Sequence, residues 1–360
     1  MSQQRTRPKA GARPAPAPGG RRQGARLALF AVLVLAAGAL AGGYAFRARQ
    51  RADQAVRAAP PVAVGPAIAT LAGRPRMLFR STALGATYGR LAGVPLAAPA
   101  GPRSLAAMDC ERVAYEAGNG LCLAADRGAV TRYTAFLFGP DFRQTHQLKV
   151  NGLPSRARLS PGGRWAVTTL FVSGHSYAAA DFSTETTIWE VASGRPVANL
   201  EQFAVTDAAG RRFKRVDFNF WGVTFAADEQ HFYATLASGG KTYLVAGDLA
   251  ARAVRVLREN VECPSLSPDG TRLVYKQRSG GAGPVTWRLH ALDLATMRDT
   301  ALAETRSVDD QVEWLDAARV LYALGAADGS ASTDVWVVPA DGGGSPKVLV
   351  KGASSPAVIA

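Results

Sequence analysis

The chain has 360 residues, of which 48% are hydrophobic and 19% charged, as in a globular protein with a sizeable core. Its formal net charge of +14 would favour nucleic acid or anionic lipid if it were spread over the whole chain. Most of it lies before residue 61, and residues 61–360 keep only +4. A nucleic-acid-binding body is therefore not expected.

The amino-terminal part has two basic blocks on either side of an apolar stretch. Residues 1–26 hold seven Lys and Arg and no acidic residue, and residues 47–60 hold four Arg against Asp53. Between them, residues 27–46 are twenty residues without a charge, which as a helix span ~30 Å, one bilayer core. This pattern predicts a single transmembrane helix. The alternative, a cleaved signal peptide, has a shorter apolar region of roughly 7–15 residues.

The charge difference also predicts a topology in the cell membrane. The larger positive excess precedes the helix, so residues 1–26 are expected to stay in the cytoplasm as a disordered basic tail. Residues 47–70 are interpreted as a linker and residues 71–360 as an extracytoplasmic folded body.

A repeat recurs through that body. "PSLSPDGTRLVYK" (264–276) predicts two strands around a Pro268-Asp269-Gly270 turn, and "ARLSPGGRWAVTTLFV" (157–172) matches it closely. Each unit has a second strand, and the first apolar residues of these strands recur every 41–47 residues, with one interval of 67. They are Leu78, Leu121, Trp165, Phe232, Leu273 and Val320.

Repeats of ~40–45 residues with four strands each are typical of propeller blades. Because no long helical pattern follows residue 60, the sequence predicts an all-β, six-bladed propeller. The first unit lacks an inner strand. "SSPAVIA" (354–360) is the favoured donor over "VAVGPAIAT" (62–70), and either would close the ring and remove its exposed edges.

The motifs "LSPDGTRLVY" and "LSPGGRWAVT", with the strand end "VWVVPADGG", resemble the TolB-type propeller repeat. The resemblance covers roughly residues 70–360. It implies a six-bladed extracytoplasmic propeller that binds other proteins, in the membrane-anchored bacterial form of TolB-like chains, with a role in envelope transport or translocation. TolB has a small α/β domain before its propeller, and this chain has a membrane anchor instead.

One stretch, "TTLFVSGHSYAAADF" (168–182), approaches the G-x-S-x-G nucleophile elbow around Ser176. Its flanking strands are antiparallel neighbours in a blade, so no strand-to-helix elbow is expected. A general base is also missing, because neither His231 nor His290 lies in a pattern that brings a carboxylate with it. No catalytic residue is predicted, and the chain is not expected to be an enzyme.

Metal and cofactor sites are not expected either. The four histidines are scattered, and the chain has no His-x-x-x-His and no Cys-x-x-Cys. The basic cluster "GRRFKR" (210–215) is interpreted as a solvated hairpin arm rather than a nucleic-acid contact.

Cys110 and Cys122 share one predicted hairpin, and an exported location permits a disulfide. A turn around residues 118–120 would place Cys122 opposite Tyr115, too far from Cys110 for a bridge across a regular ladder. The sequence does not decide whether the disulfide forms. Cys263 is expected to be a buried free thiol.

The topology of the blades predicts a candidate binding face. In a four-stranded antiparallel blade, the loop after the second strand and the connection to the next blade open on the same face, here called the mouth. The interval of 67 residues predicts enlarged loops there, at 173–186 and 201–215. Polar residues cluster where the inner strands begin: Arg156, Asp217, Asn219, Asn260, Glu262, Asp309 and Asp310.

A functional mouth and merely solvated strand ends remain alternative interpretations of this cluster. The sequence favours a monomeric propeller that binds an envelope protein or ligand. The alternative function is a propeller-type hydrolase or lactonase, which needs at least three oxygen ligands for a metal in the channel, supplied by carboxylates and Asn219 or Asn260.

Overall fold

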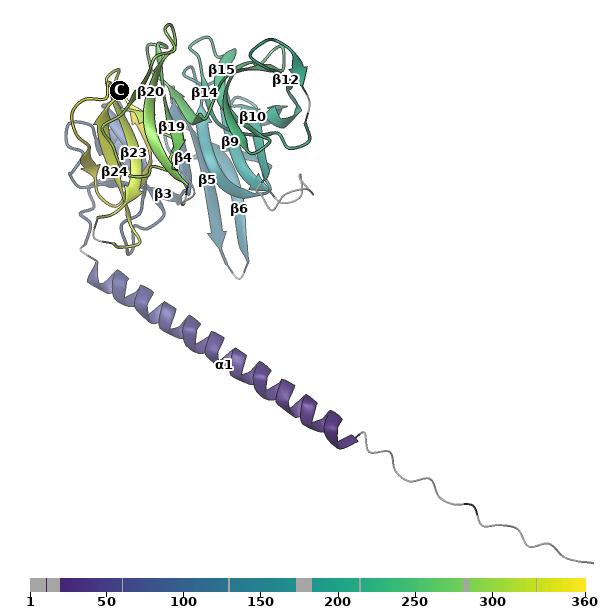
Figure 1. The fold of residues 1–360 in the computed structure, drawn as a ribbon. Coiled ribbons are helices and arrows are strands. Elements are labelled where there is room, and N and C mark those ends of the chain that lie inside the picture. Colours follow the sequence, from purple (N-terminus) through teal and green to yellow (C-terminus); the bar gives the residue numbers. More distant parts are fainter. Residues whose placement is uncertain are drawn as a thin grey trace, which may run out of the picture. The chain divides into compact units, whose positions relative to one another are not determined.

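The computed structural model describes residue 11 and residues 20–59, 61–128, 130–172, 183–213, 215–280, 285–327 and 329–360. The chain forms two compact units, residues 1–58 and residues 59–360. The described part of the first is essentially one helix, and the second is a ring of six sheets (Figure 1). The predicted fold class, a six-bladed β-propeller preceded by an apolar helix, is confirmed.

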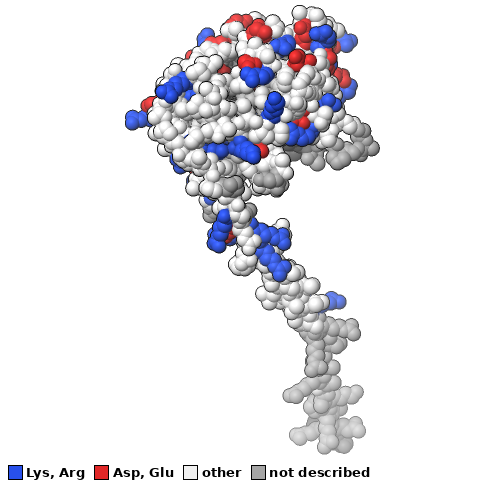
Figure 2. Space-filling model, turned by 90° about the vertical axis from the view of Figure 1, so that its left-hand side faces the viewer, with Lys and Arg blue, Asp and Glu red and all other residues white. Residues whose placement is uncertain are grey.

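The helix α1 (Gly20–Ala58) is longer than the predicted span of residues 27–46. It continues through residues 47–58, which the prediction placed in a linker, because that stretch has no Gly or Pro and contains many helix-favouring residues. The part from Gly24 to Ala58 is long and apolar enough to cross a membrane, with a mean hydropathy of 2.1 in its most apolar window. Figure 2 shows blue side chains of α1 on either side of a white stretch.

The second part of the predicted linker belongs to the propeller unit. The 3₁₀ helix η1 (Ile68–Leu71) packs on the first blade, where Ile68 and Leu71 are 5% and 6% exposed. Val64 forms an isolated parallel bridge with Arg103. These apolar contacts explain why the segment does not stay a free linker.

The blades follow one another around the ring in chain order, and in blades two, three, five and six the innermost strand comes first in the sequence. Blade one contains β26 (Ala353–Ile359), β1 (Arg76–Ser81), β2 (Arg90–Pro95) and β3 (Ser104–Asp109). Blade two contains β4 (Arg112–Glu116), β5 (Asn119–Arg127), β6 (Thr131–Phe138) and β7 (Gln144–Leu148). Blade three contains β8 (Leu153–Leu159), β9 (Trp165–Val172), β10 (Ser183–Glu190) and β11 (Arg195–Asn199).

The other three blades complete the ring. Blade four contains β14 (Asn219–Phe225), β15 (His231–Ser238), β16 (Lys241–Asp248), β17 (Ala253–Glu259), β12 (Ala204–Thr206) and β13 (Arg212–Phe213). Blade five contains β18 (Glu262–Leu266), β19 (Arg272–Ser279), β20 (Thr286–Asp293) and β21 (Asp299–Ala301). Blade six contains β22 (Glu313–Trp314), β23 (Arg319–Gly325), β24 (Thr333–Pro339) and β25 (Lys347–Val350).

The carboxyl-terminal strand β26 supplies the inner strand of blade one. It pairs antiparallel with β1, so that Met77 lies opposite Val358. The Oγ atom of Ser355 also bonds both backbone groups of Val113 on β4, accepting from its N–H at 2.9 Å and donating to its carbonyl at 3.1 Å. The first blade is therefore built from both ends of the propeller and fastened to the second.

Blade four differs from the prediction. Residues 201–215 were expected to be a mouth loop, but they form η2 (Leu200–Gln202) and the β12–β13 hairpin at the outer edge of the sheet. β12 runs parallel to β17, with Val205 opposite Val254. Val205 is buried, so burial of this apolar strand against β17 explains the correction. Of the other predicted loop, residues 183–186 belong to β10 and residues 173–182 lie outside the described part.

The recurring turn motif has a clear local function. Asp269 Oδ1 accepts hydrogen bonds from Ser267 Oγ at 2.5 Å and from the Thr271 N–H at 3.1 Å. Gly270 has a φ of 70°, a conformation that other residues resist. The motif therefore fixes the turn between the first and second strand of a blade.

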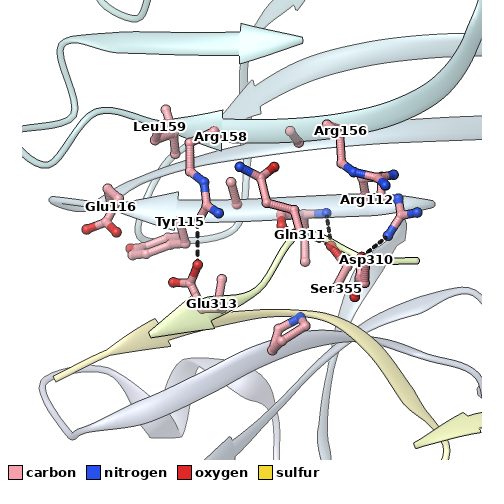
Figure 3. Close-up of a pocket in the computed structure, with 15 residues that line it drawn as sticks. Arg112, Tyr115, Glu116, Arg156, Arg158, Leu159, Asp310, Gln311, Glu313 and Ser355 are labelled. Atoms are coloured by element: carbon pink, nitrogen blue, oxygen red, sulfur yellow. Dashed lines mark hydrogen bonds and ion pairs between the residues drawn. The ribbon is translucent and has the colours of Figure 1, made fainter. Parts of the chain in front are cut away.

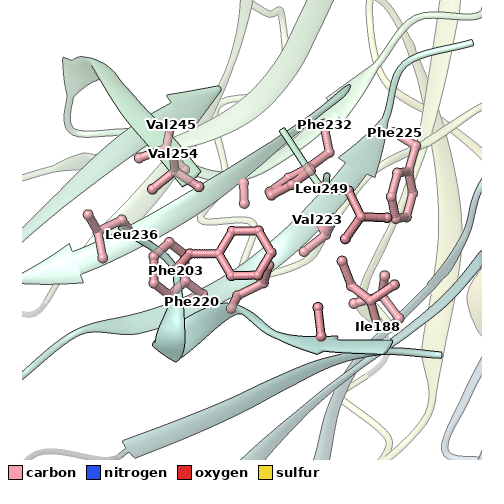
Figure 4. Packing of buried hydrophobic residues seen from close by; sticks show 14 of the residues in the cluster. Ile188, Phe203, Phe220, Val223, Phe225, Phe232, Leu236, Val245, Leu249 and Val254 are labelled. Carbon is pink, nitrogen blue, oxygen red and sulfur yellow. The ribbon is translucent and has the colours of Figure 1, made fainter. Parts of the chain in front are cut away.

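Apolar side chains fill the wedges between blades. The largest cluster joins blades three and four and includes Phe203, Phe220, Phe225 and Phe232 (Figure 4). Phe232 packs edge-on against both Phe203 and Phe225, with ring centroids 6.2 and 6.1 Å apart. Each buried side chain of this size stabilises the fold by roughly 1.5–3 kcal/mol.

Cys110 and Cys122 form a disulfide, with their Cα atoms 5.5 Å apart. The predicted register of their hairpin was wrong, because Cys122 lies opposite Val113 and not Tyr115. The turn is a tight one at Ala117 and Gly118, which both have positive φ. Cys110 precedes β4 and is free of its ladder, so its side chain can reach β5. Cys263 is a buried free cysteine, as predicted.

Candidate functional site

Four of the seven predicted mouth residues meet in one charged cluster at the channel. Its centre is Lys276 on β19, whose side chain is only 4% exposed. The Nζ atom of Lys276 pairs with Asp309 and lies 3.6 Å from Glu262 Oε2 and 4.6 Å from the ring centroid of Trp287. The buried ammonium is thus held by two carboxylates and an aromatic face.

Arg156 and Asp310 extend the same cluster towards β4 and β8 (Figure 3). Arg156 lies 3.7 Å from Asp309, and Arg112 on β4 lies 3.3 Å from Asp310. Burial lowers the pKa of Arg112, and the nearby Arg156 lowers it further. Burial would raise the pKa of Asp309, but Lys276, Arg156 and Arg112 outweigh it, so this pKa is lowered.

The pKa of Arg156 is raised although burial opposes the charge, because the Cys263 thiol and the carboxylates of Asp310 and Asp309 favour it. Its Nε atom is nonetheless buried without a hydrogen-bond partner among the described residues. The cluster is therefore mostly self-neutralising, which suits a structural function better than capture of a charged ligand.

Next to this cluster, one side chain of the segment that leads into blade six links it to blades four and five. This side chain is Gln311, and its Nε2 donates to the carbonyl oxygens of Val223 on β14 and Pro264 on β18, at 3.3 and 3.0 Å. A cavity of about 40 Å³ beside it is lined by β4, β8 and β26 and by Asp310, Gln311 and Glu313. Such a space holds one or a few waters and no larger ligand.

At the opposite end of this cavity, Glu116 faces an ion pair (Figure 3). Arg158 on β8 pairs with Glu313 on β22. Burial raises the pKa of Glu116 to about 8, and the charge of Glu313 adds to this effect while Arg158 opposes it. Glu116 is therefore mostly protonated at neutral pH.

The other three predicted residues do not join the cluster but fasten strands. Asp217 accepts from Ser238 Oγ at 2.8 Å and from the Gly239 N–H at 2.6 Å, which holds the β15–β16 turn. Asn219 Oδ1 accepts from the Thr184 N–H at 2.7 Å and links blades three and four. Asn260 exchanges two 3.0 Å hydrogen bonds with the backbone of Arg278.

The described residues contain no candidate metal site for catalysis. Among them, no group of three or more His, Cys, Asp or Glu side chains could hold a metal ion. The prediction that neither histidine has a carboxylate was wrong, since His231 Nδ1 lies 2.6 Å from Asp228 and His290 Nδ1 lies 2.9 Å from Asp299. Ser176 lies outside the described residues.

The more open site lies at blade four, on either side of its added hairpin. The first concavity, here called the Phe218 groove, has a volume of about 650 Å³ and is lined by residues 201–205, Arg212, Arg215 and Phe218. The second, the Tyr243 groove, is also about 650 Å³ and is lined by residues 207–209, Arg211, Arg215, Ser238, Gly239, Lys241, Tyr243 and residues 256–259. Arg215 lines both.

Glu201 forms the floor of the Phe218 groove and ties blade three to blade four. Its carboxylate accepts from the N–H groups of Thr186, at 3.0 Å, and Phe220, at 3.3 Å, and from Thr184 Oγ1 at 3.1 Å. Burial raises its pKa to about 7 even though these hydrogen bonds favour the charged form. The Phe218 groove is therefore built on a fixed junction between blades three and four.

Several of these residues were missed from sequence. Lys276 and Gln311 carry no local signal of burial in the channel. For Arg212 and Arg215 a signal existed: the basic cluster 210–215 was interpreted as a solvated hairpin arm, and β13 does form such an arm. The basic pattern did not predict the two grooves beside this hairpin.

Comparison with known proteins shows the fold. The structure resembles TolB from Acinetobacter baumannii with a TM-score of 0.57 and 15% identity, over 79% of this chain and 66% of that chain. The chain thus spans just under two thirds of that TolB. It also resembles a chain of the nidogen/laminin complex, with a TM-score of 0.50 and 11% identity over 79% of this chain and 98% of that one. No family model and no curated protein matches the chain.

These observations define a class: a six-bladed β-propeller with an amino-terminal helix that is long and apolar enough to cross a membrane. The propeller is TolB-like in its fold, and the resemblance seen in the repeat motifs is confirmed at that level.

Proposed function

We propose that this chain is a membrane-anchored, extracytoplasmic TolB-like propeller that acts as a binding module for a protein of the cell envelope. The helix anchors it with residues 1–26 in the cytoplasm. The propeller presents the Phe218 and Tyr243 grooves of blade four to the partner, and its action is recognition rather than catalysis.

One observation carries this proposal: the two concavities beside blade four are much larger than the cavity found at the channel. The channel cavity is about 40 Å³, whereas each groove at the hairpin is about 650 Å³. A segment of a partner protein therefore finds more room in these grooves than in the channel cavity. The β12–β13 hairpin is the main departure from a four-stranded blade, and it builds both grooves.

The anchor and the side of the membrane rest on the helix and its charges. The most apolar window of α1 has no side chain buried in the protein, whereas the core helix of a soluble protein is mostly buried. Seven basic residues precede the uncharged stretch 27–46, and the positive excess after it is smaller. An oxidising, extracytoplasmic location also suits the Cys110–Cys122 disulfide.

Site-specific photo-crosslinking in living cells tests this function. A photoreactive phenylalanine analogue replaces Ala208 or Ala209, which are exposed and line the Tyr243 groove. The matched controls are Ala295 and Ala317, two exposed alanines in blades five and six. We expect a defined protein adduct from the first pair only. Equal adducts from all four positions, or none from the groove, would contradict the proposal.

A further inference from the structure

Two arginine side chains beside the hairpin have no ion-pair partner among the described residues. Arg212 and Arg215 are exposed, and neither side chain donates a hydrogen bond to any residue that the structure describes. Arg215 lies beside the β15–β16 turn. Its Nη1 atom is 3.7 Å from the position that a Cβ atom on Gly239 would occupy. Burial would raise the pKa of the nearby Asp217 carboxyl, but the hydrogen bonds from Gly239 and Ser238 and the charge of Arg215 lower it.

The acidic residues of the two grooves are already engaged. Glu201 is bonded to backbone N–H groups, Asp207 pairs with Arg211 at 2.8 Å, and Glu259 pairs with Lys241 at 3.0 Å. Over both grooves, five basic side chains face three acidic ones. The surplus positive charge therefore lies on Arg212 and Arg215.

Apolar surface lies next to these charges. Phe203, Val205 and Phe218 line the Phe218 groove, and Tyr243, Val256 and Leu257 line the Tyr243 groove. Tyr243 and Leu257 are only partly buried, so part of the wall of the Tyr243 groove is open to a ligand. Concave sites of ~300–1,000 Å³ that combine apolar walls with a few polar groups are typical binding pockets.

We propose that the two grooves bind an extended acidic segment of a partner protein, with its carboxylates on Arg212 and Arg215 and its apolar side chains in the grooves. This inference rests on the proposed function and names the chemistry of the partner. A guanidinium binds a carboxylate through two parallel N–H···O hydrogen bonds, which an unpaired arginine can offer without breaking an existing pair. An extended chain can follow both grooves past the shared Arg215.

Binding of a labelled peptide to the full chain in neutral detergent micelles tests the inference. The probe is a fluorescein-labelled peptide of twelve residues in which Glu alternates with Leu and Phe, and its match has Gln in place of each Glu. The variant is Arg212→Gln/Arg215→Gln. The control is Arg132→Gln/Arg298→Gln, which removes the same charge from two exposed arginines of blades two and five.

We expect the Glu peptide to bind the wild-type chain at least tenfold more tightly than the Gln peptide. The Arg212→Gln/Arg215→Gln variant should lose about tenfold or more per arginine, because each charge-assisted bond contributes about that factor. The control variant should stay within twofold. Equal binding of both peptides, or equal binding by both variants, would overturn the inference. If photo-crosslinks from Ala208 and Ala209 persist in that case, the binding function stands and only the acidic partner is wrong.

Discussion

Arg112 and Asp310 form an ion pair of 3.3 Å beside the channel, between the inner strand of blade two and the segment that leads into blade six. Asp310 is buried and its other oxygen accepts from the Ala323 N–H at 3.1 Å. The carboxylate of Asp310 therefore bonds to both blade two and blade six, which are far apart in the sequence.

Replacing Asp310 by Ala should lower the free energy of unfolding by about 2–4 kcal/mol, since it leaves the partly buried guanidinium of Arg112 and the N–H of Ala323 unpaired. Urea unfolding followed by tryptophan fluorescence measures this. Asp141→Ala is the control, because Asp141 is 60% exposed and lies 3.7 Å from an exposed arginine. A similar loss in both variants would argue against the channel pair as a special contact.

The pKa of Glu116 predicts a loss of stability as the pH rises. Its folded value of about 8 lies above the ~4.3 of an unfolded glutamate, so the folded state binds this proton more tightly. The contribution is complete below about pH 4 and is lost as the pH rises to 8. Glu201, with a pKa of about 7, acts in the same direction.

The Glu116→Gln variant should therefore match the wild-type chain at pH 4 and exceed it at pH 8 by on the order of 4 kcal/mol. Melting temperatures across pH 4–8 measure the difference. Glu259→Gln is the control, since Glu259 is 57% exposed. An unchanged pH dependence in Glu116→Gln would show that this carboxyl is ionised in the folded protein.

The cysteines can be counted directly. In the denatured, unreduced protein from an oxidising compartment, one thiol per chain should react, that of Cys263. Replacing Cys110 and Cys122 by Ala should lower the free energy of unfolding by about 2–4 kcal/mol, as expected for a short loop of twelve residues. Three reactive thiols would mean that the bridge does not form in the cell.

Ring closure is tested from the carboxyl end. Deleting residues 353–360 removes β26, which exposes the inner edge of β1 and the apolar groups that it covers. We expect aggregation and a lower melting temperature. Deleting Ala360 alone, which follows β26, should change neither. A shortened chain that stays monodisperse and melts at the original temperature would contradict the closure.

Protease treatment of intact protoplasts tests the proposed topology. Residues beyond 60 should be digested, and a tag placed before residue 26 should survive until the membrane is permeabilised. Protection of the propeller would reverse the orientation that the charge difference predicts.

Much of the fold could be predicted because its signal is local. The Pro-Asp-Gly turn and the apolar strand after it lie within a dozen residues, and they place a blade wherever they recur. Pro356 within a short apolar run was enough to favour residues 354–360 as the inner strand of blade one.

The features that were missed depend on contacts across the chain. β12 is three residues long and pairs with β17 about fifty residues later in the sequence. No local sequence pattern predicts a parallel pair of this kind. Lys276 looks like the solvated end of a strand, and only Glu262 and Asp309, from other segments, show that it is buried. The Cys110–Cys122 bridge depended on a turn that is one residue tighter and earlier than the glycines suggested.

The place of β26 sets an order of events during biosynthesis. Met77 meets Val358, its partner in blade one, only after the residues that form the other five blades have been made. Until then the inner edge of β1 stays unpaired, although the later blades can already form. The pairing of β26 (Ala353–Ile359) with β1 therefore completes the ring, and long-range pairings of this kind form slowly. A chain truncated before β26 would hold five complete blades and a first blade that cannot close.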